Sequence, residues 1–229
     1  MRIGVLAVQG AFAEHSAKVC QIGAEAVEIR KCRDIQTELD GMILPGGEST
    51  TMRKLLTELD LLEPLKEMIQ NGMPVFGTCA GMILLAKEIS GSGTPCFGTL
   101  DISVQRNAYG RQLGSFRCTD TFAGKKIEMP FIRAPYAQNV SDNVTVLASH
   151  DNRIVAVRQD NQLATAFHPE LTEDFTVYEY FFQMIAKRLR KYPENRSLLA
   201  QALNTCTASV SRCLAEERPL RWNRPLTKK

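Results

Sequence analysis

The chain has 229 residues, of which 44% are hydrophobic, with 28 basic and 25 acidic side chains. This size and composition fit one medium-sized globular unit with an appendage, and they exclude a disordered, collagen-like or coiled-coil chain. Residues 190–229 hold nine of the basic and three of the acidic side chains, so the body is slightly acidic and is not expected to bind nucleic acid.

Short apolar runs alternate with amphipathic stretches in the first part of the chain. Buried strands are predicted at 3–8, 26–30, 41–45 and 74–78. Helices are predicted at 11–22, at 51–71 with a break near Pro64, and at 80–89. This alternation indicates βαβ units, so the predicted fold is α/β: a three-layer, doubly wound, mostly parallel sheet flanked by helices.

The pattern changes near residue 100. Short alternating runs separated by Asn, Asp and Gly predict a short antiparallel portion over 101–166. Helical spacing returns at 173–189, and again after Pro193 as far as about 217. We therefore expect one domain over 1–190 and a C-terminal extension over 191–229, formed by an added helix and a disordered basic tail.

The cysteine pattern and the apolar stretches bear on the compartment. Seven cysteines are spread along the chain without a CxxC pair, which argues against a disulfide framework and favours a reducing cytoplasm. Gln9 and Gly10 interrupt the apolar start, so a strand and a turn are predicted there rather than a signal peptide. The uncharged stretch 68–86 contains too many Gly, Pro and amide residues for a membrane span.

A cysteine framed by small residues follows the strand at 74–78. The motif GTCAG at 77–81 allows the tight turn of a nucleophile elbow, which exposes the sulfur of Cys79 at the start of a helix. The helix dipole and the free N–H groups there favour a thiolate, which is the nucleophilic form. The alternative is a buried structural cysteine, the usual state of a free cysteine.

His168 is the candidate base for this nucleophile. It follows an apolar strand in FHPEL, and Pro169 holds the backbone extended, so that His168 and Glu170 share a face. A triad of Cys79, His168 and Glu170 is predicted, in which Glu170 fixes the histidine tautomer and stabilises the imidazolium. A metal pair would need further ligands, so no metal is expected. His15 and His150 are interpreted as a helix-face and a loop histidine without a role.

The second glycine motif is ILPGGEST at 43–50. Its adjacent glycines can turn backbone N–H groups inward, where they would stabilise a tetrahedral oxyanion. Alone, the turn is equally compatible with a phosphate site or a plain connection. The Cys79 elbow favours the oxyanion, because both turns lie at the carboxyl ends of parallel strands.

Six segments together resemble one family: AVQGAFAEH, ILPGGESTTMRKLL, FGTCAGMILLAKEI, VQRNAYGRQ, FIRAP and FHPELTED. They are similar to the glutaminase subunits of pyridoxal 5'-phosphate synthase, which are class I (triad) glutamine amidotransferases, and the resemblance covers about 1–190. GxCxG and HPE alone would indicate only the broad class, whereas GGESTTMR, RNxxGRQ and FIRAP in this order point to the vitamin B6 branch.

The resemblance implies roles for residues of the matching motifs. Cys79 would be the nucleophile, with His168 and Glu170 completing the triad. The implied contacts of L-glutamine are Gly46, Gly47, Glu48, Arg106, Ile132 and Arg133. The implied oxyanion donors are the backbone N–H groups of Gly47 and Ala80. An arginine suits the α-carboxylate of glutamine, and a carboxylate such as Glu48 suits its α-ammonium group.

The resemblance also implies a reaction and a partner. The enzyme would hydrolyse L-glutamine to L-glutamate and ammonia without a cofactor. It would pass the ammonia to a (β/α)8-barrel synthase subunit that builds pyridoxal 5'-phosphate, and the two subunits would form a hetero-oligomer. Neither nucleic acid nor a membrane is expected as a partner. Gln9 and Gly10 match a turn that lies near the synthase contact in the family. The glutaminase would be weak until that partner binds.

Three other interpretations remain at this point, and the chain departs from the family pattern twice. The alternatives are the glutaminase subunit of another amidotransferase, a cysteine peptidase or isomerase on a related sheet, and a non-catalytic binding subunit. The departures are Tyr136 where histidine often follows Pro135, and the extension beyond residue 190. Neither touches the predicted triad.

Overall fold

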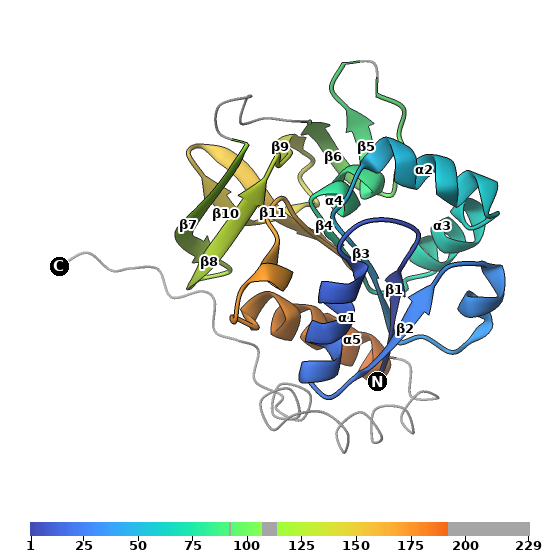
Figure 1. Cartoon of the computed structure of the whole chain (residues 1–229). Coiled ribbons are helices and arrows are strands. Elements are labelled where there is room, and N and C mark those ends of the chain that lie inside the picture. The colour runs from blue at the N-terminus through green and yellow to red at the C-terminus, as the bar shows by residue number, and fades with distance from the viewer. Residues whose placement is uncertain (92, 107–113, 192–229) are drawn as a thin grey trace.

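The computed structural model describes residues 1–91, 93–106 and 114–191. Within these residues ten strands form one sheet, whose order is β2-β1-β3-β4-β12-β11-β9-β6-β5 with β10 paired to β11. A separate two-stranded sheet consists of β7 and β8. Helices cover the central sheet (Figure 1), and its first half is parallel throughout. The predicted α/β fold class is therefore confirmed.

The parallel half of the sheet carries the site. Its strands are β2 (Glu25–Ile29), β1 (Arg2–Leu6), β3 (Gly41–Leu44), β4 (Val75–Thr78) and β12 (Gln162–Thr165). Every residue of β3, β4 and β12 is buried, because helices pack on both faces of these strands.

The helices divide between the two faces of this half (Figure 1). One face carries α1 (Phe12–Gln21) and α5 (Thr176–Lys191). The other carries α2 (Ser49–Glu58), α3 (Leu62–Gln70) and α4 (Ala80–Leu85). The predicted break in 51–71 falls at residues 59–61. Pro64 lies in the first turn of α3, where a backbone N–H would have no acceptor within the helix. The proline therefore removes no helical hydrogen bond.

One predicted helix is too long. The helix expected over 80–89 ends at Leu85, and β5 (Ala86–Ile89) follows directly. Residues of β5 pair in parallel with β6 (Leu100–Gln105). The apolar spacing of this segment is compatible with either structure, and pairing with β6 decides between them.

The second half of the chain is mainly antiparallel, as predicted. Its strands are β7 (Ser115–Phe122), β8 (Lys125–Ile132), β9 (Tyr136–Val140), β10 (Thr145–His150) and β11 (Arg153–Gln159). Two short 3-10 helices are η1 (Cys32–Gln36) and η2 (Pro169–Leu171). The helix predicted after Pro193 and the basic tail lie outside the described residues. Within the described ranges, none of the helices has the length and apolar character needed to cross a membrane.

Strand register brings the chemical motifs together. Leu44 of β3 is level with Gly77 of β4, and Thr78 of β4 is level with Thr165 of β12. The turns that follow these three strands therefore leave the sheet at the same edge, which is where open α/β sheets bind ligands.

Candidate active site

Cys79 lies on a strained turn between β4 and α4. Its φ of 48° and ψ of −99° are unusual for a residue with a Cβ, and its N–H donates to the Thr165 carbonyl at 2.7 Å. A Cβ on Gly77 would lie 2.7 Å from the Gly81 carbonyl carbon, and one on Gly81 would overlap the Leu44 carbonyl oxygen. Both glycines are therefore required for the close approach that forms the elbow.

His168 and Glu170 meet as predicted, although residues 169–171 form the 3-10 helix η2 and not the extended backbone that was expected after His168. The Nδ1 atom of His168 lies 2.7 Å from Oε1 of Glu170, whose side chain is fully buried. Nε2 of His168 has no hydrogen-bond partner within the described residues. A Cβ on Gly46 would lie 3.0 Å from Nδ1 of His168 and 3.4 Å from Cβ of Cys79. The His168 ring and Cys79 therefore lie side by side against the glycine loop, and position 46 of this loop has room only for a glycine.

The surroundings favour the charged form of both His168 and Glu170. Burial disfavours the imidazolium form of His168, but the neighbouring Cys79 sulfur and Glu170 carboxylate outweigh it and raise the pKa of His168 to about 10. Burial also disfavours the Glu170 carboxylate, but His15 and His168 outweigh it and hold the pKa of Glu170 below its usual range. The ring thus carries a proton that it can donate to a departing group.

A cavity of about 400 Å³ opens beside Cys79 and His168. It brings together eight of the ten predicted site residues, namely Gly46, Gly47, Glu48, Cys79, Arg106, Ile132, Arg133 and His168. The other two lie just behind its wall. Ala80 is the buried first residue of α4, and Glu170 lies behind the His168 ring. The volume suits a small molecule such as an amino acid.

Glu48 and Arg106 form a charged pair at this cavity. Glu48 caps α2 by accepting from the N–H groups of Thr50 at 3.1 Å and Thr51 at 2.7 Å. Partial burial opposes ionisation, but the hydrogen bonds from Thr51 and Thr50 lower the pKa of Glu48 to about 2. Nη2 of Arg106 lies 3.5 Å from Oε1 of Glu48. The cavity therefore presents an anion and a cation together, which suits the zwitterionic end of a free amino acid.

The turn after β1 supports the glycine loop. The Glu48 N–H donates to Oε1 of Gln9 at 2.8 Å, and the Ala11 N–H donates to the Gly46 carbonyl at 3.0 Å. Gly10 has a φ of +98°, and a Cβ there would overlap that same carbonyl. The turn at residues 9–11 thus sets the orientation of the peptide between Gly46 and Gly47.

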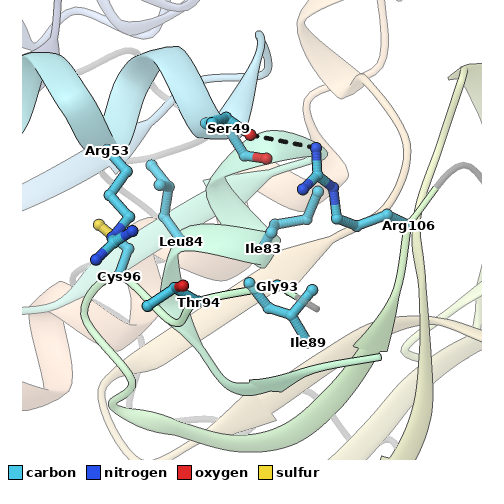
Figure 2. A pocket seen from close by; sticks show the side chains of 10 residues that line it. Ser49, Arg53, Ile83, Leu84, Ile89, Gly93, Thr94, Cys96 and Arg106 are labelled. Carbon is cyan, nitrogen blue, oxygen red and sulfur yellow. Dashed lines mark hydrogen bonds between the residues drawn. The ribbon is translucent and has the colours of Figure 1, made fainter. Parts of the chain in front are cut away.

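A second cavity of about 170 Å³ shares Ser49, Ile83 and Arg106 with the lining of the first. Figure 2 shows Arg53 and Ser49 of α2 along one wall, with Cys96 and Thr94 below Arg53 and Arg106 approaching from the opposite side. The dashed line in Figure 2 is the 3.4 Å contact of Arg106 Nη2 with the Thr50 hydroxyl. Arg106 therefore contributes to the lining of both cavities.

His15 lies on a face of α1, as predicted, and this face is buried beside Glu170. Its side chain is fully buried, and its Nε2 lies 3.4 Å from Oε2 of Glu170. Helical spacing offered one signal, because position 15 shares the apolar face of α1 with Val19. His150 ends β10 rather than lying in a loop, and its Nδ1 lies 3.0 Å from Oδ2 of Asp120. Among the described residues, no group of three or more His, Cys, Asp or Glu side chains is arranged to hold a metal ion.

Comparison with known proteins places this geometry in a family. A solved structure titled "Crystal structure of glutamine amidotransferase" superposes with a TM-score of 0.76 at 42% identity, covering 80% of this chain and 98% of that one. The structure titled "Structure of PurLQS from Thermotoga maritima" matches with a TM-score of 0.56 at 17% identity, covering 82% of this chain and 98% of that one, which shows the fold alone.

Curated relatives are closer in sequence. A protein of Methanocorpusculum labreanum named pyridoxal 5'-phosphate synthase subunit PdxT is 58% identical over 187 residues, which cover 81% of this chain and 98% of the relative. A protein of the same name from Streptococcus pneumoniae is 52% identical over 192 residues, covering 82% and 99%. The model of the SNO glutamine amidotransferase family matches residues 5–187. The chain therefore belongs to the SNO glutamine amidotransferase family.

Proposed function

We propose that this chain hydrolyses L-glutamine to L-glutamate and ammonia, and that it delivers the ammonia to a synthase subunit that makes pyridoxal 5'-phosphate. The observation that carries the proposal is the buried pair of His168 and Glu170 beside the Cys79 elbow, at a cavity that holds both an anion and a cation. Membership of an amidotransferase family supports the same reaction.

In the proposed reaction Cys79 attacks the side-chain amide carbon of glutamine. The thiolate sulfur forms a bond to that carbon, and the carbonyl π electrons move onto oxygen. When the tetrahedral intermediate collapses, the carbon–nitrogen bond breaks and His168 gives its proton to the nitrogen, which leaves as ammonia. Neutral His168 then takes a proton from water, whose oxygen attacks the γ-glutamyl thioester. The carbon–sulfur bond then breaks, which restores the thiolate beside the imidazolium, and the new γ-carboxyl group loses its proton to solvent as glutamate leaves.

The remaining residues of the cavity would hold the substrate and stabilise the intermediate. Arg106 would bind the α-carboxylate of glutamine and Glu48 its α-ammonium group, exchanging their mutual 3.5 Å contact for contacts with the substrate. Ile132 and Arg133 would line the channel of its side chain. The backbone N–H groups of Gly47 and Ala80 would stabilise the oxyanion.

The proposed partner is the barrel subunit of pyridoxal 5'-phosphate synthase, in a hetero-oligomer. The curated relatives bear the name of a subunit of that synthase, which supports an assembly with further chains. The turn at residues 9–11 touches the glycine loop directly, so a partner that binds this turn would act on the Gly47 N–H. The five described cysteines are free thiols, which supports a reducing compartment such as the cytoplasm.

The test is ammonia release from L-glutamine by the purified chain, with and without an added synthase barrel subunit. We expect release that rises when the barrel is present and vanishes in Cys79→Ala. Strong release that ignores the barrel would instead indicate another amidotransferase. No release under either condition would contradict the proposed hydrolysis.

A further inference from the structure

His15 is a buried ionisable side chain that the proposed reaction does not use. It lies on α1, and its exposed fraction is zero. Its ring meets three elements: Nε2 lies 3.1 Å from the Thr78 hydroxyl at the end of β4, and Nδ1 lies 2.8 Å from the Tyr178 hydroxyl of α5. The third contact is with Glu170 of η2, at 3.4 Å from Nε2 to Oε2. His15 therefore touches both the residue before the nucleophile and the triad carboxylate.

The two carboxylate oxygens of Glu170 differ in their hydrogen bonding. Oε1 is engaged with His168 at 2.7 Å, whereas Oε2 is buried and has no hydrogen-bond partner within the described residues. Burying a carboxylate oxygen without a hydrogen-bond donor raises the free energy of the folded chain, and it does so most when the carboxylate is ionised. The Nε2 atom of His15 faces Oε2 at slightly more than hydrogen-bonding distance, close enough for a polar hydrogen to stabilise its charge.

The contacts of His15 determine which nitrogen carries its proton. Burial lowers the pKa of His15, so the ring is neutral near pH 7 and has one donor and one acceptor. Burial raises the pKa of Tyr178 well above its usual value, so the phenol keeps its proton and can donate it to Nδ1. The ring proton then lies on Nε2, the nitrogen that faces Thr78 and Glu170.

We propose that His15, oriented by Tyr178, is a positioning residue that keeps Glu170 ionised and turned toward His168. This inference rests on the proposed triad and adds to it a second layer from α1 and α5. The ionisable groups that face His15 are Glu170, His168 and Tyr178, together with Glu14 on its own helix. Of these, Glu170 is the one whose charge the Nε2 hydrogen supports directly.

A purely structural role makes a different prediction. The His15 ring packs edge-on against Phe76 with 6.1 Å between ring centroids, and it lies 6.0 Å from the Tyr178 ring. If only this packing mattered, substitution would lower the melting temperature and leave the pH dependence of the reaction unchanged. If the donor matters, the acid side of the pH profile moves.

The decisive pair of variants is His15→Gln and His15→Asn. A glutamine amide can place an N–H near the position of Nε2, whereas an asparagine amide reaches only the position of Nδ1. Loss of the Nε2 donor lets Glu170 take up a proton at higher pH. His15→Asn should therefore shift the acid limb of kcat/KM upward and lower kcat near pH 6.5 by roughly tenfold, with KM for glutamine changed by less than about twofold. His15→Gln should stay within about threefold of the parent.

The measurement uses the full chain assembled with the synthase barrel, and His150→Gln serves as the matched control. His150 also pairs with a carboxylate but does not line the main cavity, so its variant should keep the parent profile. Equal profiles for His15→Asn and His15→Gln would overturn the inference. If His15→Asn does not fold, Tyr178→Phe decides: it should move the acid limb in the same direction by less, and no movement would overturn the inference.

A second readout separates this inference from the proposed function. The rate of Cys79 alkylation by iodoacetamide, followed across pH by mass spectrometry of the peptide, needs neither glutamine nor the barrel. We expect slower alkylation near pH 6.5 in His15→Asn than in His15→Gln, because a neutral Glu170 no longer supports the imidazolium beside the sulfur. If that difference appears while no Cys79-dependent ammonia is formed by the parent, the proposed reaction fails and the positioning role stands. Equal alkylation rates would contradict the positioning role.

Discussion

Two cysteine–histidine–carboxylate groupings lie in different halves of the molecule. The elbow cluster, at the edge of the parallel half, consists of Cys79, His168 and Glu170. The β7 cluster, on the antiparallel side, consists of Cys118, His150 and Asp120. Their histidine–carboxylate distances are alike, 2.7 Å in the first and 3.0 Å in the second. The same three kinds of side chain, with similar histidine–carboxylate distances, therefore occur in two very different settings.

The difference lies in which ring nitrogen meets which partner. In the elbow cluster the carboxylate faces Nδ1, and Nε2 has no hydrogen-bond partner in the part of the chain that the structure describes. In the β7 cluster the sulfur of Cys118, at 3.6 Å, and the carboxylate of Asp120 both face Nδ1 of His150, so the ring cannot relay a proton between them. Burial and the nearby aspartates also raise the pKa of Cys118, which disfavours its thiolate. Ring orientation and backbone strain, rather than residue types, therefore distinguish the proposed catalytic cluster from the β7 cluster.

The largest expected contrast comes from the two cysteines. Cys79→Ala should abolish ammonia release, because the nucleophile is lost and no other group can form the thioester. Cys118→Ala should retain the parent rate, and its fold should be intact by circular dichroism. Measurable turnover by Cys79→Ala under the same conditions would remove the elbow cluster from the reaction.

The two carboxylates give the next contrast. Glu170→Gln should lower kcat by roughly 10²- to 10⁴-fold, because the ring loses the anion that fixes its tautomer and stabilises its charge. Asp120→Asn should change kcat by less than about twofold, since Asp120 is partly exposed and belongs to the β7 cluster. Steady-state kinetics of both variants with the synthase barrel present would decide, and equal losses would contradict the distinction.

The glycines beside each cluster give a smaller contrast. A Cβ at Gly46 would press on the His168 ring, so Gly46→Ala should lower kcat/KM by roughly 10²-fold through displacement of the ring. Gly114, just before β7, has open space around it, and Gly114→Ala is the matched control with little expected effect. A Gly46→Ala enzyme with parent kinetics would show that the ring tolerates movement.

The smallest expected effect concerns stability against pH. The pKa of His168 is about 10 in the folded chain, against about 6.5 in an unfolded one. A pKa raised by folding adds stability that is complete below about 6.5 and is lost as the pH rises through about 10. Between pH 6.5 and pH 10 this stabilisation falls by roughly 4 kcal/mol, so the melting temperature of the parent should fall by roughly 10 °C more than that of His168→Gln. An equal fall in both would contradict the strong pairing of this ring.

The sequence sufficed for the features that local rules control. Alternating strands and helices predicted the parallel half, and a tight glycine-framed turn predicted the Cys79 elbow. The contact of His168 with Glu170 was predicted, but for the wrong local structure, because Pro169 begins the 3-10 helix η2 and does not extend the chain. Most residues that line the main cavity were predicted from the family motifs and not from their spacing in the sequence.

Contacts between distant segments determine the features that the sequence did not predict. Residues 86–89 fit a helix by their spacing and become β5 only because β6 pairs with them. The role of His15 depends on α1 and α5 packing on the same face, which brings Tyr178 to within 2.8 Å of a residue 163 positions away. Neither contact follows from periodicity, since each depends on how distant elements assemble.

The proposed reaction requires that Cys79 forms a covalent γ-glutamyl intermediate during glutamine hydrolysis. The most direct test is to quench the enzyme with acid while it turns over glutamine with the synthase barrel present, and to locate the adduct by peptide mass spectrometry. We expect a γ-glutamyl adduct on Cys79 that is absent in Cys79→Ala and absent from Cys118. An adduct on another residue, or rapid ammonia release by Cys79→Ala, would contradict it.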